Sequence, residues 1–110
     1  MSNWVNICKF DEISPNMGRC ALFEKEQVAI FRVIEGGAEK LYALNNFCPF
    51  SEANVISRGI VGSLSGKVMV ASPIYKQHFD LATGQCIEDE AVALKAYQVR
   101  VENDMVQLSA

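Results

Sequence analysis

Two segments decide the fold of this chain, and they read NFCPF over residues 46–50 and SPIYKQHFDLATGQC over residues 72–86. Both are expected to form loops that bring polar or sulfur-bearing side chains to one place. After the second loop, His78–Leu81 is expected to pair with Gln85–Ile87 across a short turn. Gly84 lies at the end of that turn, where a positive φ angle suits glycine.

The two segments resemble the loops that hold a Rieske iron–sulfur centre. Such a centre takes two Cys and two His ligands, from one loop reading Cys-Pro-His and another reading Cys-Pro-x-His that runs on into Phe-Asp-x-x-x-Gly. In this comparison the four ligand positions hold Cys48, Phe50, Ser72 and Tyr75. Phenylalanine cannot bind iron, and Ser and Tyr oxygens are poor substitutes for thiolate and imidazole. The resemblance therefore implies a Rieske frame whose cluster ligands are degenerate.

The resemblance extends over most of the chain. Trp4–Cys8 is similar to the opening strand of Rieske-type ferredoxin domains, and Val28–Phe31 with Lys40–Leu44 resembles the hairpin before the first ligand loop. The pattern is similar in particular to the small subunit of assimilatory NAD(P)H-dependent nitrite reductase, a cytoplasmic bacterial enzyme. The phrases that carry this likeness are Gln27–Arg32, Ser57–Gly59, Val70–Pro73 and Glu88–Glu90.

That family resemblance carries expectations about function. The family reduces nitrite to ammonium in nitrogen assimilation, and its flavin, sirohaem and iron–sulfur cluster are expected on the large subunit, with no cofactor in this chain. The expected partner is the large subunit, which this chain would dock on and support without catalysing the reaction alone. The absence of a Gly-x-Gly-x-x-Gly fingerprint fits that division. The choice between NADH and NADPH stays open.

Size and charge narrow the function classes. With 110 residues, the chain is expected to form a single Rieske-like domain, 1–110, with a loop-bearing subdomain at about 46–86. A domain of this size buries roughly 65% of its unfolded surface. The net charge is −3 and no Lys/Arg cluster is present, so nucleic acid and anionic membranes are not expected partners.

The cysteines and the first residues bear on location. Neither a secretory signal nor an apolar run of about 20 residues is found, so a cytoplasmic location is expected. Thiols stay reduced there. The sequence has no Cys-x-x-Cys motif, and Cys8, Cys20, Cys48 and Cys86 are expected to be free. Cys8, Cys20 and Cys86 are interpreted as packed small hydrophobes.

Short segments separated by turn residues predict an all-β fold, a Rieske-type ferredoxin-like antiparallel β-sandwich or partial barrel with a small two-loop subdomain. Turns are expected at Gly36-Gly37 and Asn103-Asp104. One short helix is expected within Pro49–Ile56. The expected strands are Trp4–Lys9, Arg19–Phe23, Val28–Ile34, Lys40–Asn45, Lys67–Ala71, His78–Leu81 and Gln85–Ile87, followed by an alternating tail after Tyr97.

The tip formed by the two loops is the candidate partner interface, with Phe47, Phe50, Ile74 and Tyr75 as its residues. The alternative is that these side chains fill the space of a cluster and form a small core. An exposed apolar patch would favour the interface, whereas burial would favour the core.

Two other groups have chemical interpretations. Cys48 and His78 come from loops that meet, so a nucleophile–base pair or a metal site that includes a carboxylate is conceivable. The run Glu88–Glu90 is interpreted first as a solvated turn, and second as a patch that steers a basic partner.

Two alternatives to the nitrite reductase interpretation stay open. One is a cluster-free Rieske-like adaptor of another reductase or oxygenase, which capture of the native partner would identify. The other is a redox carrier with a non-standard metal site, which iron and sulfide analysis would reveal.

Overall fold

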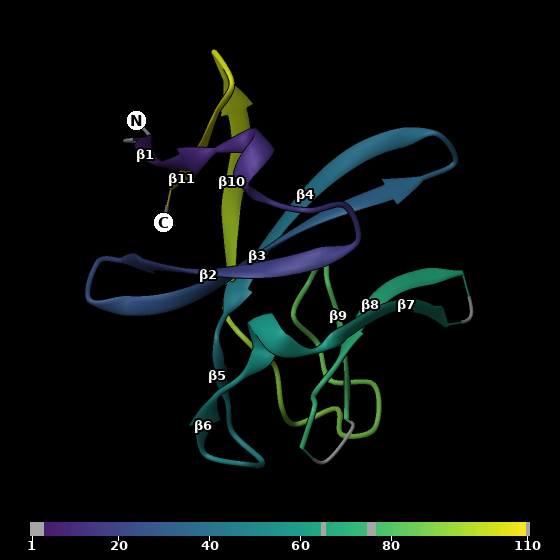
Figure 1. The fold of residues 1–110 in the computed structure, drawn as a ribbon. Helices are drawn as coiled ribbons and strands as arrows, with labels where there is room; N and C mark the ends of the chain where they lie inside the picture. The colour runs from purple at the N-terminus through teal and green to yellow at the C-terminus, as the bar shows by residue number, and fades with distance from the viewer. Residues whose placement is uncertain (1–3, 65, 75–76, 110) are drawn as a thin grey trace.

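The computed structural model describes residues 4–64, 66–74 and 77–109, and its arrangement is shown in Figure 1. Tyr75, which is both a predicted ligand position and a candidate interface residue, lies outside these described residues. The strands are β1 Val5–Lys9, β2 Met17–Phe23, β3 Glu26–Glu35, β4 Ala38–Asn45, β5 Phe47–Cys48, β6 Ala53–Asn54, β7 Ile60–Leu64, β8 Lys67–Ala71, β9 His78–Asp80, β10 Ala96–Glu102 and β11 Met105–Ser109, with short 3-10 helices η1 Phe10–Glu12 and η2 Ile56–Arg58.

The largest sheet is antiparallel and has the strand order β1-β11-β10-β4-β3-β2. Tight turns join its hairpins, because two successive residues in each turn adopt positive φ. These turns include the predicted Gly36-Gly37 and Asn103-Asp104. A third lies at Glu24-Lys25, where the residues have φ angles of 50° and 69° without the help of glycine.

The large sheet curls so that its two edge strands border one core. Cys8 of β1 and Phe23 of β2 belong to the same buried cluster, although their strands lie at opposite ends of the sheet order. Val28, Ile30 and Leu108 complete the centre of that cluster. The result is a nearly closed antiparallel sheet, which confirms the predicted all-β, Rieske-type fold class.

A second core lies on the other face of β3, against the loop-bearing part of the chain. Successive side chains of a strand point to opposite faces. Ala29 and Phe31 therefore point into this second core, while Val28 and Ile30 point into the first. The second core is covered by the sheet β7-β8-β9 and by the hairpin β5-β6. Burial on both faces explains the unbroken apolar run in β3.

The structure corrects one element prediction, adds one strand that was not predicted and limits the extent of a third element. The helix expected within Pro49–Ile56 does not form, because β5 and β6 pair there around a turn that includes Glu52 at φ 53°. The strand β7 was missed, since its Ile60 is exposed and Gly62 carries no side chain to continue the alternation. Gln85–Ile87 pairs with β9 as predicted, but only through the single bridge Phe79–Cys86 and flanking hydrogen bonds.

No helix in the described part of the chain is long and apolar enough to cross a membrane.

Candidate functional site at the paired loops

The fold brings the two predicted loops together. Cys48, at the end of β5, and Ser72, just after β8, are both buried, and their Sγ and Oγ atoms lie 3.6 Å apart. The positions that correspond to the two Cys ligands of a Rieske centre are therefore neighbours. The site is a thiol facing a hydroxyl beneath the loops.

The surroundings of Cys48 affect its protonation in two opposing ways. Burial is the largest influence and alone would raise the pKa of the thiol. Hydrogen bonding from Ser51, from the backbone at Phe50 and from the Ser72 hydroxyl outweighs burial, so the pKa lies below its ordinary value of 9.0. The buried Ser51 hydroxyl has no partner at normal hydrogen-bond distance, whereas the Ser72 hydroxyl lies 3.6 Å from the Cys48 sulfur.

Phe50 occupies the position of the first His ligand and packs inward. Its ring centroid lies 6.2 Å from that of Phe79, a fully buried residue of the second core. Phe50 is only partly buried, so one part of the ring fills the loop-bearing part of the fold and the rest reaches the surface. This arrangement supports the small-core interpretation for Phe50 without removing it from the surface.

Phe47 and Ile74 behave differently, since both are exposed. Their relative exposures are 42% and 49%, respectively, although both side chains are large and apolar. The Phe47 backbone is fixed by pairing with Asn54 and by a hydrogen bond from its N–H to Asn45 Oδ1 at 3.0 Å. An exposed aromatic side chain on a fixed backbone is a common feature of protein interfaces.

His78 does not pair with Cys48. Its Nδ1 lies 2.6 Å from Glu88 Oε2, and its backbone N–H donates to Glu88 Oε1 at 2.7 Å. Burial of Glu88 would raise the pKa of its carboxyl, but these hydrogen bonds and the His78 charge hold the pKa below its ordinary value of 4.5. The described contacts therefore provide no base for a Cys48 nucleophile.

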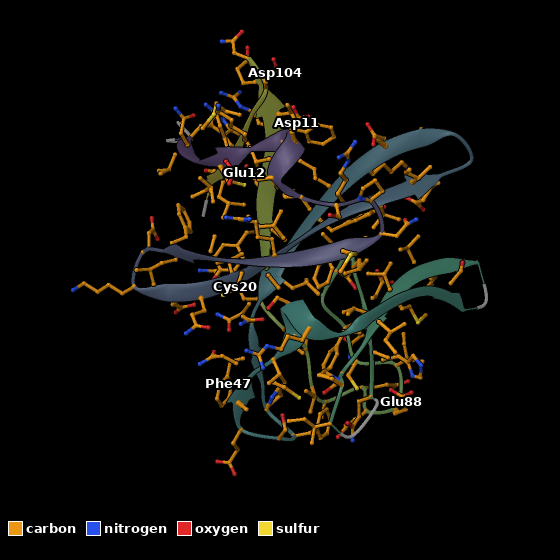
Figure 2. All side chains as sticks on the ribbon, viewed as in Figure 1. Asp11, Glu12, Cys20, Phe47, Glu88 and Asp104 are labelled. Atoms are coloured by element: carbon orange, nitrogen blue, oxygen red, sulfur yellow. The ribbon has the colours of Figure 1, made fainter. Side chains whose placement is uncertain are left out.

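Two of the three acidic residues in Glu88–Glu90 form hydrogen bonds within the fold, which the solvated-turn interpretation did not predict. Glu88 holds His78, and Asp89 Oδ1 accepts a hydrogen bond from the Ala91 N–H at 3.0 Å. Only Glu90 matches the expectation of an exposed carboxylate without such a role among the described contacts. Figure 2 shows Glu88 on the side of the loop-bearing part opposite Phe47.

The cysteines are free, as predicted, but the predicted burial of one of them, Cys20, is wrong. Cys8, Cys48 and Cys86 are buried, whereas Cys20 is exposed. The Cys20 thiol donates to Gln27 Oε1 at 3.4 Å and accepts from Asn46 Nδ2 at the same distance. It lies in the middle of β2, and its apolar neighbours in the sequence do not predict that it is exposed.

Two structural residues near the site were missed from the sequence. Asn46 is buried, and its Oδ1 accepts the Ser57 N–H at 2.6 Å. Gln85 Nε2 donates to backbone carbonyls of the loop that follows it, including Val92 O at 2.9 Å. Asn46 is the first residue of the first loop, but its neighbours in space come from distant segments that local sequence patterns do not identify.

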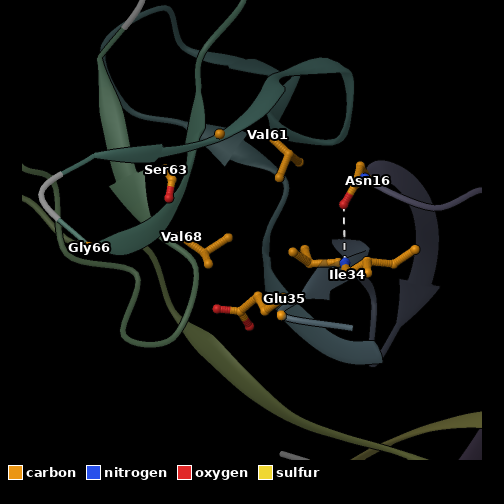
Figure 3. Close-up of a pocket in the computed structure, with 10 residues that line it drawn as sticks. Asn16, Ile34, Glu35, Val61, Ser63, Gly66 and Val68 are labelled. Carbon is orange, nitrogen blue, oxygen red and sulfur yellow. Dashed lines mark hydrogen bonds between the residues drawn. The ribbon is translucent and has the colours of Figure 1, made fainter. Parts of the chain in front are cut away.

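A cavity of about 510 Å³ lies elsewhere, between the end of β3 and the β7–β8 hairpin (Figure 3). Its wall is mixed, with Val33, Val61 and Val68 beside polar groups, and Asn16 Oδ1 accepts the Ile34 N–H there at 3.1 Å. None of the described lining residues belongs to either loop. This cavity is separate from the Cys48–Ser72 site.

Comparison with known proteins places the chain in a family. A family model described as Rieske-like [2Fe-2S] domain matches residues 3–109. The nitrite reductase (NADH) small subunit of Salmonella typhimurium is 48% identical over 98% of both chains. The chain belongs to the nitrite reductase (NADH) small-subunit family.

Two further similarities extend this family assignment. A crystal structure of a putative NADH-dependent nitrite reductase small subunit from Mycobacterium tuberculosis superposes with a TM-score of 0.92, at 38% identity over 100% of this chain and 96% of that one. A nitrite reductase [NAD(P)H] large subunit of Klebsiella oxytoca is 40% identical over 94% of this chain, and the matched stretch is 10% of that longer chain. In that relative, a small-subunit-like domain is part of the large-subunit chain.

The family match corrects the expectation that this chain has no cofactor, because the matching domain family is described by a [2Fe-2S] centre. The described ligand positions nevertheless supply one thiol, one hydroxyl and a phenyl ring. No group of three or more His, Cys, Asp or Glu within 4–64, 66–74 and 77–109 is arranged to hold a metal ion. This donor set does not fit a centre with two Cys and two His ligands.

Proposed function

We propose that this chain docks on the large subunit of an NADH nitrite reductase and stabilises it, without supplying catalytic residues of its own. The similarity to small subunits over nearly the full length of both chains carries this proposal. The Klebsiella oxytoca chain supports it further, since two domains joined in one relative often associate when they are separate chains.

The surface at the paired loops suits a docking role. Phe47 and Ile74 are exposed apolar side chains that lie within two residues, along the chain, of the buried Cys48 and Ser72, respectively. Phe50 adds a partly exposed ring at the same tip. Apolar side chains grouped on a soluble domain mark protein interfaces. We therefore propose Phe47, Phe50 and Ile74, together with Tyr75, as the interface at the tip.

The finer features of the function follow the family. We propose that the complex acts in the cytoplasm, where it reduces nitrite to ammonium for nitrogen assimilation. We also propose that residues 1–110 act as one domain, with 46–86 as its loop-bearing part.

The test is calorimetric binding of the full chain to the purified large subunit. Phe47→Asp combined with Ile74→Asp is expected to weaken binding at least ~10-fold, because each change places a charge in an apolar contact. Val101→Asp is the matched control, since Val101 is 41% exposed on β10, far from the loops in sequence and sheet order. Failure of the unaltered chain to bind the large subunit would refute the proposed function.

If the double variant binds like the unaltered chain while the complex forms, the interface lies elsewhere. Tyr75→Asp adds a separate test of the second loop, with weakened binding and an unchanged thermal midpoint as the expected result.

A further inference from the structure

One face of the β2–β3 hairpin extends past the loop-bearing part of the molecule. Directly opposed residues of antiparallel strands point to the same side of a sheet, and so do residues two apart in one strand. The register therefore places three pairs on this face: Gly18 with Phe31, Cys20 with Ala29, and Leu22 with Gln27.

The loop-bearing part covers only one end of this face. At Gly18 the cover is so close that an added Cβ would lie 2.6 Å from the Ser57 carbonyl oxygen of η2. Two residues further along, Cys20 is exposed, and Leu22 is exposed to 72%. The uncovered end of the hairpin therefore projects next to the side of the first loop.

The uncovered end of the hairpin and the side of the first loop meet at a surface that we call the β2–β5 corner. We define this corner by Cys20, Leu22, Gln27 and Phe47. Figure 2 shows Cys20 and Phe47 on the same side of the molecule. A groove of about 370 Å³ adjoins the corner at Gln27 and Phe47, and its other lining residues are Lys25, Glu26, Asn45 and Asn54.

The corner is held in shape by internal hydrogen bonds. Gln27 Oε1 accepts hydrogen bonds from Asn46 Nδ2 at 3.1 Å and from the Cys20 thiol. These bonds connect the hairpin to the first loop. Phe47 is fixed by its N–H bond to Asn45 Oδ1. A surface ordered before binding loses less entropy when a partner docks.

The charges at the corner indicate what chemistry it accepts. Lys25 lines the groove and is exposed, and Arg58 is close enough to Cys20 to influence its thiol. The Glu26 carboxylate in the groove already accepts hydrogen bonds from Tyr97 Oη at 2.8 Å and Asn45 Nδ2 at 2.6 Å. Both donors are neutral, so Glu26 keeps its negative charge, and the groove holds one cation, Lys25, and one anion, Glu26.

We infer that the β2–β5 corner receives a segment of the large subunit that inserts an apolar side chain between Leu22 and Phe47 and places polar groups in the groove beside Lys25 and Glu26. The inference rests on the proposed function, because it assigns to that partner a surface that continues from the tip residue Phe47 up to β2. The small-subunit-like domain within the Klebsiella oxytoca large-subunit chain favours this occupant over an unrelated protein.

The test uses the full chain and the purified large subunit. Leu22→Glu is compared with Ile60→Glu, because Ile60 is equally exposed at 74% but lies on β7, outside the corner. Leu22→Glu is expected to weaken binding at least ~10-fold, and Ile60→Glu to change it less than about twofold. Both variants are expected to keep the thermal midpoint of the free chain.

Cys20 provides a second readout without any substitution, because it is exposed while the other cysteines are buried. Its alkylation by iodoacetamide, followed by mass spectrometry, is expected to slow at least ~10-fold when the large subunit is in excess. The same rate with and without a complex that is visible by gel filtration would overturn the inference and leave the proposed function standing.

Two other outcomes also decide against the inference. If no complex forms with the unaltered chain, the proposed function and the inference fail together. If Leu22→Glu abolishes self-association of the free chain but leaves large-subunit binding unchanged, the corner is a contact between copies of this chain.

Discussion

At the residue scale, Asn46 connects three separate segments through one buried side chain. Its Nδ2 donates to Gln27 Oε1, and its Oδ1 accepts the Ser57 N–H. Its backbone N–H donates to Gln27 O at 2.8 Å, and its carbonyl accepts the Ile56 N–H at 3.1 Å. The start of the first loop is thereby tied both to β3 and to η2.

Replacing Asn46 by alanine is expected to lower the free energy of unfolding by about 2–3 kcal/mol, because buried polar partners lose their bonds. Urea unfolding measures the change. Asn54→Ala, at an exposed position of β6, is the control and is expected to stay within about 0.5 kcal/mol. Equal effects of the two substitutions would show that the Asn46 bonds contribute little.

Glu88 gives a prediction about acid stability. Its pKa is lower in the folded chain than the ordinary 4.5, so between these two pKa values the unfolded chain binds more protons. Stability therefore increases with pH through that window, is fully present above about pH 4.5 and is lost as pH falls through the folded pKa. Glu88→Gln is expected to flatten this part of the curve of thermal midpoint against pH. An unchanged slope would contradict the assignment.

At the element scale, the features predicted from the sequence are those with local causes. The turns at Gly36-Gly37 and Asn103-Asp104 were predicted, because turn chemistry is set by the turn residues themselves. The short strands around Pro49–Ile56 were not, since they depend on contacts between residues apart in the sequence, such as the bond from the Ser57 N–H to Asn46 Oδ1. The pairing of Cys48 with Ser72 follows from the loop resemblance, whereas the His78–Glu88 pair depends on a tertiary contact.

A substitution in the turn between β10 and β11 is expected to stabilise the fold. Asn103 and Asp104 have φ angles of 52° and 63°, and Asn-Gly is the preferred pair for such a turn. Asp104→Gly is expected to raise the free energy of unfolding by about 0.5–1 kcal/mol, since it removes backbone strain. The thermal midpoint would increase by roughly 3–5 °C.

Gly37→Ala is the opposite substitution at a comparable turn. Gly37 has φ 83°, and no atom lies within 4 Å of an added Cβ, so only the backbone strain changes. Gly37→Ala is expected to lower the free energy of unfolding by about 1 kcal/mol. If both substitutions shift the midpoint in the same direction, backbone strain does not explain them.

At the scale of the whole molecule, β3 belongs to two cores at once. Ile30 is fully buried in the core of the large sheet, and its neighbour Phe31 is fully buried against the loop-bearing part. Neither core can lose β3 without exposing the other. This sharing supports the proposal that residues 1–110 unfold as one domain.

Ile30→Ala and Phe31→Ala test this sharing. Each is expected to cost about 2–5 kcal/mol and to leave a single cooperative transition. Trp4 fluorescence reports on the large sheet, and amide exchange in β8 and β9 reports on the loop-bearing part. Separate midpoints for the two probes in the Phe31→Ala variant would show that the cores unfold independently.

The first and last strands of the sheet also lie side by side, since Val5 pairs with Leu108 across β1 and β11. A longer polypeptide that entered this fold at β1 and left it at β11 would do so at almost one point on the surface. This geometry allows the domain to be fused to or inserted into a longer chain without displacing either strand. In Klebsiella oxytoca a stretch 40% identical to this chain makes up 10% of a large-subunit chain, and a designed fusion through β1 or β11 is a route to one chain that contains both subunits.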